Sequence, residues 1–194
     1  MYDKATVPSI QFGPDFTLGD SIPVCRWIDD NMEGPKIYPS STVDAHSLEL
    51  VLNKFGSKII GPCYKLLRNK DPSADRELAQ KVMDGCEWFN NCLALRGIGP
   101  GPDGKKFFAE GKFGMFEILT CSFFDRFRNT LKHWRGLDLI TDSLSSLSVW
   151  MAAVDASPAF MHTCREGDFY ILCYARYAQN QQRKWDALPE ASSK

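Results

Sequence analysis

The hydrophobic pattern of the chain changes once, close to its N-terminus. Apolar and polar positions alternate in two short segments, Ser9 to Phe12 and Phe16 to Leu18. Such alternation is typical of strands, and the intervening Gly13-Pro14-Asp15 is typical of a turn. We therefore predict two short strands here and helices throughout the rest of the chain.

From Asp20 onward, apolar residues recur every three or four positions. The first such segment places Ile22, Cys25 and Ile28 on one face of a short helix, which should end at Gly34-Pro35. This single apolar face predicts that all these side chains are buried, and that Cys25 is an inert thiol.

A long amphipathic helix is predicted next, reaching about Arg68, with a kink at Gly61-Pro62 because proline removes a backbone donor. Its apolar stripe comprises Leu48, Val51, Leu52, Phe55, Ile59, Cys63 and Leu66. Asp71-Pro72 then predicts the N-cap and first residue of another helix. The buried stripe of that helix comprises Leu78, Val82, Phe89 and Leu93.

The remaining pattern predicts a loop and three further helices. The loop is the Gly- and Pro-rich segment Arg96 to Lys106, and the third long helix is Phe113 to Trp134. A fourth helix should begin with Asp142 as its cap and stop at Ser157-Pro158. The last helix is expected from Asp168 to about Gln182. The inward positions of the third and fourth helices are Ile118, Phe124, Phe127, Leu131, Leu144, Leu147, Met151 and Val154.

Composition and charge exclude several classes of function. The formal net charge is −1, and no basic block stands apart from the helical pattern, which argues against nucleic-acid binding. No apolar run approaches the ~20 residues of a membrane helix. The three histidines show no metal-ligand spacing, so no metal site is expected. The seven cysteines form no C-x-x-C pair, which favours reduced thiols in the cytoplasm or an organelle interior.

The linker between the strand-containing and helical parts is rich in Pro, Gly and Ser. It predicts a first domain over residues 1–33, a linker over 34–41 and a helical domain over 42–194.

The order of these elements and three groups of residues resemble the glutathione transferase family over nearly the whole chain. The first group is Val7-Pro8 and Asp20-Ser21, similar to a strand-opening cis-proline dipeptide and to an acidic-Ser pair at a helix start. The second is F-x-x-G-K-F-G-M-F-E from Phe108, and the third is Trp150 with Ser157-Pro158-Ala159. The segment Arg126 to Gly136 is most similar to the omega and lambda branch.

This resemblance implies a mostly α fold. An all-helical C-terminal domain of the glutathione-transferase type would follow a truncated thioredoxin-like β-β-α remnant. The sequence departs from the family's capping motif at two positions. Gly114 stands where the motif normally has Ser or Thr, and Glu117 stands where it normally has Asp, although Gly remains an acceptable N-cap.

The resemblance also implies a glutathione site at Val7, Pro8, Asp20 and Ser21. The main chain of Val7, held by Pro8, would bind the cysteinyl backbone of glutathione. Ser21 and the helix N-terminus would bind the γ-glutamyl carboxylate, and Asp20 the ammonium group. The alternative is that Pro8 only begins a strand and Ser21 only caps a helix.

The family's first strand, first helix, second strand and catalytic residue normally precede the Val-Pro dipeptide, and they have no counterpart here. Cys63-Tyr64, on the bent long helix, are the remaining candidates for chemistry. The missing first strand would also leave Ser9 to Phe12 as an open edge, which a partner, a second copy or upstream sequence should cover.

Two functions remain open. The first is a non-catalytic interaction or structural subunit, favoured because Met1 stands directly before the retained half. The second is a glutathione-dependent transferase or thiol reductase whose catalytic segment is missing from this chain or supplied by a partner.

Overall fold

The computed structural model of the protein describes residues 7–109, 111–179 and 181–183. Its first elements are two antiparallel strands, β1 (Ser9–Phe12) and β2 (Phe16–Gly19), in the register that pairs Ser9 with Gly19 and Phe12 with Phe16. Gly13 adopts a φ of +64°, which the tight turn between the strands requires. The predicted strand pair is confirmed.

Helix α1 (Ser21–Asn31) follows β2 directly. The Trp27 ring lies 3.8 Å from the Phe12 ring, centroid to centroid, so the helix packs on the apolar face of the hairpin. Asp29 is buried, and its carboxylate accepts hydrogen bonds from the backbone N–H groups of Ile37 and Tyr38 at 2.7 and 3.3 Å. The helix is therefore held by the hairpin and by the segment that follows it.

The predicted buried face of α1 is wrong in part. Ile22 and Ile28 are 41% and 42% exposed, and Cys25 is half-buried, whereas Val24 is buried. The reason is that α1 contacts the hairpin through Trp27 and the following segment through Asp29, which leaves other apolar positions uncovered. Residues 32–41 contain no regular structure, and the predicted domain boundary within them stays a prediction.

The predicted long helix consists of α2 (Thr42–Phe55), a π-helical turn η1 (Gly56–Ile60) and α3 (Gly61–Arg68). The π turn directly precedes Pro62, whose missing N–H breaks the regular hydrogen-bond ladder. Where a kink was expected, the structure therefore has a wider, π-helical turn within one continuous helix. Gly85 packs against this turn so closely that a Cβ atom there would lie 2.1 Å from the carbonyl oxygen of Lys58.

Helix α4 (Asp75–Leu95) is preceded by a single 3₁₀ turn, η2 (Pro72–Ala74). The Asp71 carboxylate accepts a hydrogen bond from the Ser73 N–H at 2.9 Å, so the predicted N-cap is confirmed, although it caps the 3₁₀ turn. The predicted buried stripe of α4 is also confirmed: Leu78, Val82, Phe89 and Leu93.

Helix α5 (Met115–Arg135) begins with the predicted capping arrangement. The buried Glu117 carboxylate accepts hydrogen bonds from the Gly114 and Phe108 N–H groups at 3.1 and 2.9 Å, and from the Trp150 indole at 3.1 Å. One carboxylate thus joins the loop, the start of α5 and α6 (Ser145–Asp155).

Two predicted helix limits are wrong. Asp142 does not cap α6, because the Leu144 N–H bonds to the Thr141 carbonyl at 2.9 Å and places Asp142 in a turn before the helix. Helix α8 (Gly167–Tyr174) ends well before Gln182, and beyond it the Arg183 N–H bonds to the Trp134 carbonyl of α5 at 3.0 Å. Ser157-Pro158 follows α6 as predicted, but it opens α7 (Pro158–Met161).

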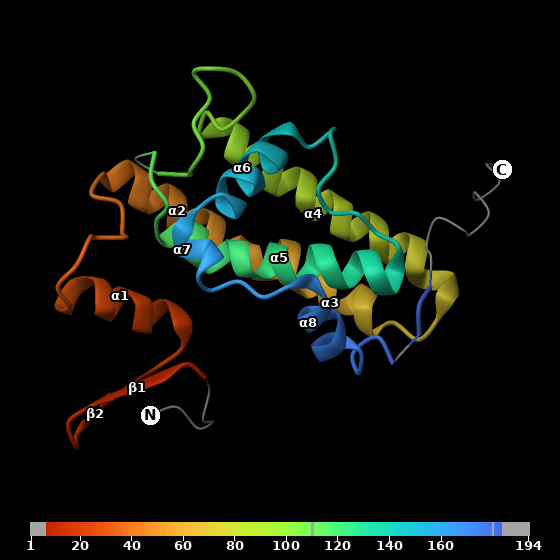
Figure 1. The fold of residues 1–194 in the computed structure, drawn as a ribbon, viewed down its shortest axis with the longest axis horizontal. Helices are drawn as coiled ribbons and strands as arrows, with labels where there is room; N and C mark the ends of the chain where they lie inside the picture. Colours follow the sequence, from red (N-terminus) through yellow and green to blue (C-terminus); the bar gives the residue numbers. More distant parts are fainter. Residues whose placement is uncertain (1–6, 110, 180, 184–194) are drawn as a thin grey trace.

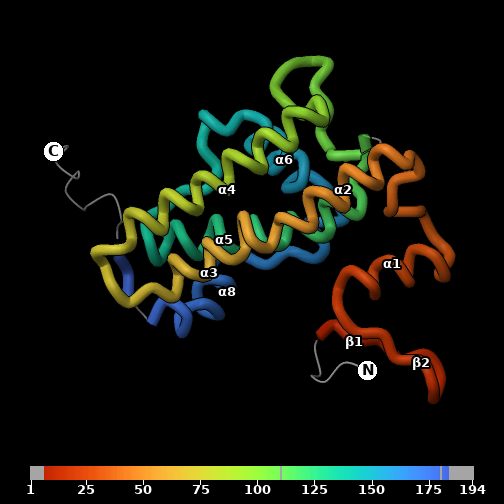
Figure 2. The backbone as a smooth tube through the Cα atoms, turned by 180° about the vertical axis from the view of Figure 1, so that it is seen from behind, coloured from red at the N-terminus to blue at the C-terminus, as the bar shows by residue number. Residues whose placement is uncertain are grey.

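The helices α2–α8 form a bundle, and β1, β2 and α1 form an N-terminal unit at one end of it (Figures 1 and 2). The long helices α2–α3, α4 and α5 lie side by side in both views. The centre of the bundle is aromatic, with ring centroids of Phe89 and Phe124 4.8 Å apart and those of Phe89 and Trp150 5.4 Å apart. The bundle therefore contains a closed hydrophobic core, and the N-terminal unit lies outside this core.

Candidate functional site

The residues predicted to bind glutathione lie together at the N-terminus of α1. The Val7-Pro8 peptide bond is cis, and the Pro8 carbonyl accepts a hydrogen bond from the Asp20 N–H at 3.1 Å. Val7, Asp20 and Ser21 are all exposed. The fold therefore brings the two dipeptides, which are separated in sequence by the hairpin, to one surface.

Asp20 has an unusual backbone conformation, with φ 75° and ψ 144°. This left-handed region costs a non-glycine residue about 1–3 kcal/mol. Asp20 is the N-cap residue of α1, but its side chain forms no capping hydrogen bond with the helix backbone. Ser21 Oγ instead donates a hydrogen bond to Asp20 Oδ1 at 3.4 Å. Helix capping by Ser21 therefore does not explain why these polar residues stand here.

Neither Cys63 nor Tyr64, the two predicted candidates for chemistry, is activated. Cys63 is fully buried, and desolvation raises its pKa well above the ordinary value. Desolvation also raises the pKa of the half-buried Cys25. The Tyr64 hydroxyl lies 3.0 Å from that of Tyr174, and burial raises its pKa to about 12. These groups do not suit nucleophilic or general-base roles near neutral pH.

The sheet of the N-terminal unit contains two strands among the described residues, and β1 pairs only with β2. Such a small sheet leaves backbone groups of its outer edges available to another strand. The same unit exposes large apolar side chains: Phe12, Phe16, Ile22, Ile28 and Met32. The two-stranded sheet and these exposed apolar side chains therefore belong to the same N-terminal unit.

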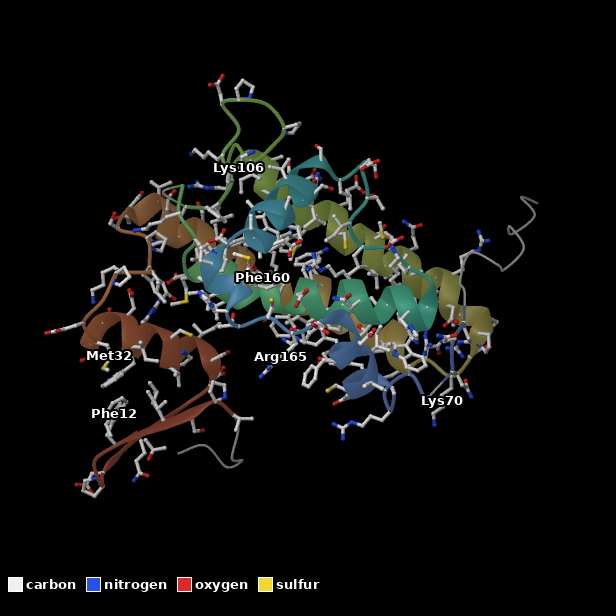
Figure 3. All side chains as sticks on the ribbon, in the orientation of Figure 1. Phe12, Met32, Lys70, Lys106, Phe160 and Arg165 are labelled. Carbon is white, nitrogen blue, oxygen red and sulfur yellow. The ribbon has the colours of Figure 1, made fainter. Side chains whose placement is uncertain are left out.

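An apolar groove of about 470 Å³ lies between the segment that follows α1 and the helices α5 and α7. Phe160 of α7 lines the groove, whereas Met32 and Phe12 of the N-terminal unit, which Figure 3 labels with it, do not. The lining residues are Pro35, Ile37, Phe113, Ile118, Cys121, Ser122, Ala159, Phe160, Thr163, Cys164 and Tyr170. The sequence did not predict this groove, because its lining residues come from segments that are far apart in the chain.

Two classes of site have no support among the described residues. They contain no group of three or more His, Cys, Asp or Glu side chains that could hold a metal ion. No helix in the described part of the chain has both the length and the apolar character needed to cross a membrane.

Comparison with solved structures defines the class of the fold. A trimeric glutathione transferase from Leishmania, TDR1, superposes with a TM-score of 0.70 at 20% identity, over 83% of this chain and 34% of that one. Glutathione transferase Omega 3C from Trametes versicolor superposes with a TM-score of 0.70 at 17% identity, over 90% and 70%. The chain has the glutathione-transferase fold, with a short β-β remnant before the helical part.

Sequence comparison identifies the relatives more narrowly. The chain is 25% identical to the chloroplastic glutathione S-transferase L2 of Arabidopsis thaliana over 186 residues, and 24% identical to glutathione S-transferase L3 of the same plant over 163 residues. Its homologues are thus glutathione S-transferases of the lambda type. The chain spans 57% and 62% of the length of these two relatives. No protein-family model matches it.

Proposed function

We propose that this chain acts as a non-catalytic interaction or structural subunit with a glutathione-transferase fold. The observation that carries this proposal is the N-terminal unit, where a two-stranded sheet adjoins exposed Ile22, Ile28 and Met32. Contiguous apolar surface and open strand edges are typical of interfaces between proteins. The partner would pair with β1 over Ser9–Phe12 and cover the apolar residues of α1.

The raised pKa values of two thiols, Cys25 and Cys63, support the same proposal. A transferase must stabilise the thiolate of glutathione, or supply its own low-pKa cysteine. Cys25 and Cys63 both have raised pKa values because they are desolvated. The subunit would therefore contribute surface and, at most, part of a ligand site.

Isolation of the native complex with substituted chains tests this proposal. Ile28→Asp is expected to release the partner, because a charge would be buried in the interface. Leu50→Asp is the control, since Leu50 is also an exposed apolar residue but lies on α2. Retention of the same partner by wild type and Ile28→Asp would contradict the proposal, and so would a chain that is isolated alone as a monomer.

A second function is favoured by the geometry at Asp20 and Ser21. Strained residues whose side chains do not serve the fold are concentrated at functional sites. We propose as the alternative a glutathione-dependent transferase or thiol reductase, completed by a segment or partner that supplies the catalytic group. The main chain of Val7, fixed by Pro8, would bind the cysteinyl backbone of glutathione. Ser21 would bind its γ-glutamyl carboxylate and Asp20 its ammonium group.

Retention on glutathione resin, together with activity toward a generic electrophile or mixed disulfide, separates the two functions. The enzyme is expected to show both, and the subunit is expected to show no activity. Ser21→Ala should abolish any retention, whereas Ser47→Ala, whose hydroxyl bonds within α2, should not change it. Unchanged retention in Ser21→Ala would refute this site.

A reducing compartment, either the cytoplasm or an organelle interior, fits both functions. All seven cysteines are free thiols, and Cys63, Cys86 and Cys121 are buried in the bundle. The relative L2 is named chloroplastic, which is compatible with an organelle interior for this protein.

A further inference from the structure

Three tyrosines form an aromatic cluster between α3 and the end of α8. The ring centroid of Tyr64 lies 6.0 Å from that of Tyr174 and 5.8 Å from that of Tyr177. Arg126 of α5 donates a hydrogen bond to the Tyr174 hydroxyl at 3.3 Å, and this hydroxyl is 3.0 Å from that of Tyr64. The cluster is therefore held in place by three helices.

Arg68, the last residue of α3, lies over two of these rings. Its guanidinium carbon is 4.9 Å from the Tyr64 centroid and 4.8 Å from the Tyr177 centroid. Stacking on aromatic faces orders a guanidinium and leaves the N–H groups at its edge able to bind an acidic group. Among the described residues, Arg68 forms no ion pair with a carboxylate. Within the described part of the chain, its charge is thus ordered but not paired with a carboxylate.

An open hollow of about 600 Å³ adjoins this arginine. Its lining residues are Gly61, Tyr64, Lys65, Arg68, Asn69, Lys70 and Leu78, of which three are cations and none is acidic. The neighbouring Glu77 is paired with Lys81. Because the formal net charge of the whole chain is −1, the cations gathered here are a local feature. A concave surface with one sign of charge attracts the opposite charge.

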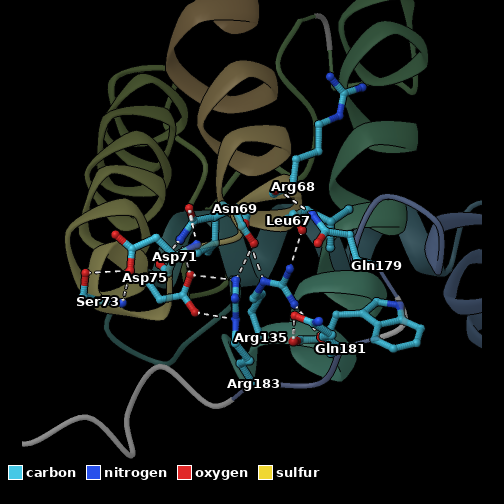
Figure 4. Close-up of polar contacts among 12 residues, drawn as sticks. Leu67, Arg68, Asn69, Asp71, Ser73, Asp75, Arg135, Gln179, Gln181 and Arg183 are labelled. Atoms are coloured by element: carbon cyan, nitrogen blue, oxygen red, sulfur yellow. Dashed lines mark hydrogen bonds and ion pairs between the residues drawn. The ribbon is translucent and has the colours of Figure 1, made fainter.

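The C-terminal carbonyl groups of α3 do not repel an anion at the hollow. Helix C-terminal carbonyls normally carry partial negative charge, but here Arg135 donates hydrogen bonds to the carbonyls of Leu66 and Leu67. Gln179 donates to the Arg68 carbonyl at 3.3 Å. The guanidinium of Arg68 extends away from this capping network (Figure 4). The helix end is therefore neutralised from within the bundle, while Arg68 remains at the hollow.

We propose that this hollow binds a small aromatic acid. Its carboxylate or sulfonate group pairs with Arg68 and Lys65, and its flat apolar body lies over Gly61, which has no side chain, and against Leu78 and Tyr64. The apolar part of the lining favours such a molecule over a bare inorganic anion, which would use only the cations. This site is separate from Val7, Asp20 and Ser21, and it does not depend on the proposed function.

Calorimetric titration with 2-naphthoate and its uncharged counterpart 2-naphthamide tests the proposal. The acid is expected to bind at least about tenfold more tightly, because an ion pair with an ordered arginine contributes roughly that factor. Added salt should weaken the binding of the acid and leave that of the amide unchanged. Amide chemical shifts of residues 61–70 should move with the acid.

Two substitutions test whether Arg68 binds the acidic group of the ligand. Arg68→Gln should weaken naphthoate binding about tenfold without changing the circular dichroism melt, because Arg68 is exposed. Arg165→Gln is the matched control, since Arg165 is also exposed and also lies over an aromatic ring, that of Phe169, but does not line the hollow. Its affinity for naphthoate should equal that of the wild type.

Three outcomes would overturn the proposal. They are equal affinity for the acid and the amide, no binding of either, or wild-type affinity in Arg68→Gln. Should Arg68→Gln melt early, Lys65→Gln replaces it. That exposed lysine should contribute about threefold to the affinity for naphthoate, and no loss there would refute the assignment.

Discussion

The helical bundle and the N-terminal unit bury their apolar side chains to different extents. In the bundle, Phe89, Phe124 and Trp150 are fully buried and surround one another. In the N-terminal unit, Phe12 and Ile28 remain about two-fifths exposed, although both belong to apolar faces. The same residue types therefore form a closed hydrophobic core in one region and a partly exposed apolar surface in the other. The difference arises because the long helices of the bundle enclose these rings, whereas the hairpin and α1 cover each other's apolar faces only in part.

The largest expected effect contrasts one phenylalanine from each region. Phe89→Ala should lower the free energy of unfolding by about 3–5 kcal/mol, because it opens a cavity in the aromatic centre. Phe12→Ala should lower it by about 1 kcal/mol or less, because Phe12 is partly exposed and contacts mainly Trp27. Urea denaturation measures both. Equal losses would mean that the hairpin belongs to the same packed core as the bundle.

A pair of glycines tests how tightly the bundle is packed. Gly85→Ala should lower the free energy of unfolding by about 1–3 kcal/mol, because the new Cβ would lie 2.1 Å from the Lys58 carbonyl oxygen. Gly56→Ala meets no atom within 4 Å and should instead raise stability by about 0.5–1 kcal/mol. Thermal melts followed by circular dichroism distinguish the two signs. A neutral Gly85→Ala would show that the π turn yields easily.

Glu117 should make the stability of the bundle depend on pH in an unusual direction. Burial raises its pKa above the ordinary carboxyl value in the folded state. Between the unfolded and folded pKa values the folded state binds more protons, so the contribution of Glu117 falls as pH rises through this window. Glu117→Gln should remove that slope. It should also cost about 1–3 kcal/mol, because the amide cannot accept all three hydrogen bonds.

Glu77→Gln is the control of opposite sign for this pH dependence. The hydrogen bond and charge of Lys81 lower the pKa of the exposed Glu77, so its contribution is present above the ordinary carboxyl range and is lost as pH falls. Urea denaturation across the acidic range should therefore give the two variants slopes that differ from wild type in opposite directions. Parallel curves for all three proteins would contradict the assignment to Glu117.

The smallest expected effect is local and concerns amide hydrogen exchange. Amides of β1 in the isolated chain should exchange with little protection, because a two-stranded sheet opens at almost no cost in free energy. Amides at the centre of α5 should show protection close to the global stability. In the native complex, the amides of Ser9–Phe12 should become slower, whereas those of α5 should not change. Unchanged exchange in β1 would mean that the partner binds elsewhere.

The sequence determined the features that depend on neighbouring residues. Alternation predicted the hairpin, and the three- and four-residue spacing predicted the buried stripe of α4. Each pattern places its apolar side chains on one face of the element to which they belong. Asp71 and Glu117 were found as caps because capping joins groups only a few residues apart. The resemblance at Val7-Pro8 and Asp20-Ser21 singled out residues that the structure places together at the start of α1.

Tertiary structure decided everything that depends on distant contacts. The exposure of Ile22 and Ile28 could not follow from periodicity, because a helical stripe shows which residues share a face and not what covers that face. Arg68 meets Tyr177 only because α8 ends early and the chain turns back across α3. Burial and the gathering of charge are properties of surfaces that separate segments build together, and these surfaces exist only once the chain has folded.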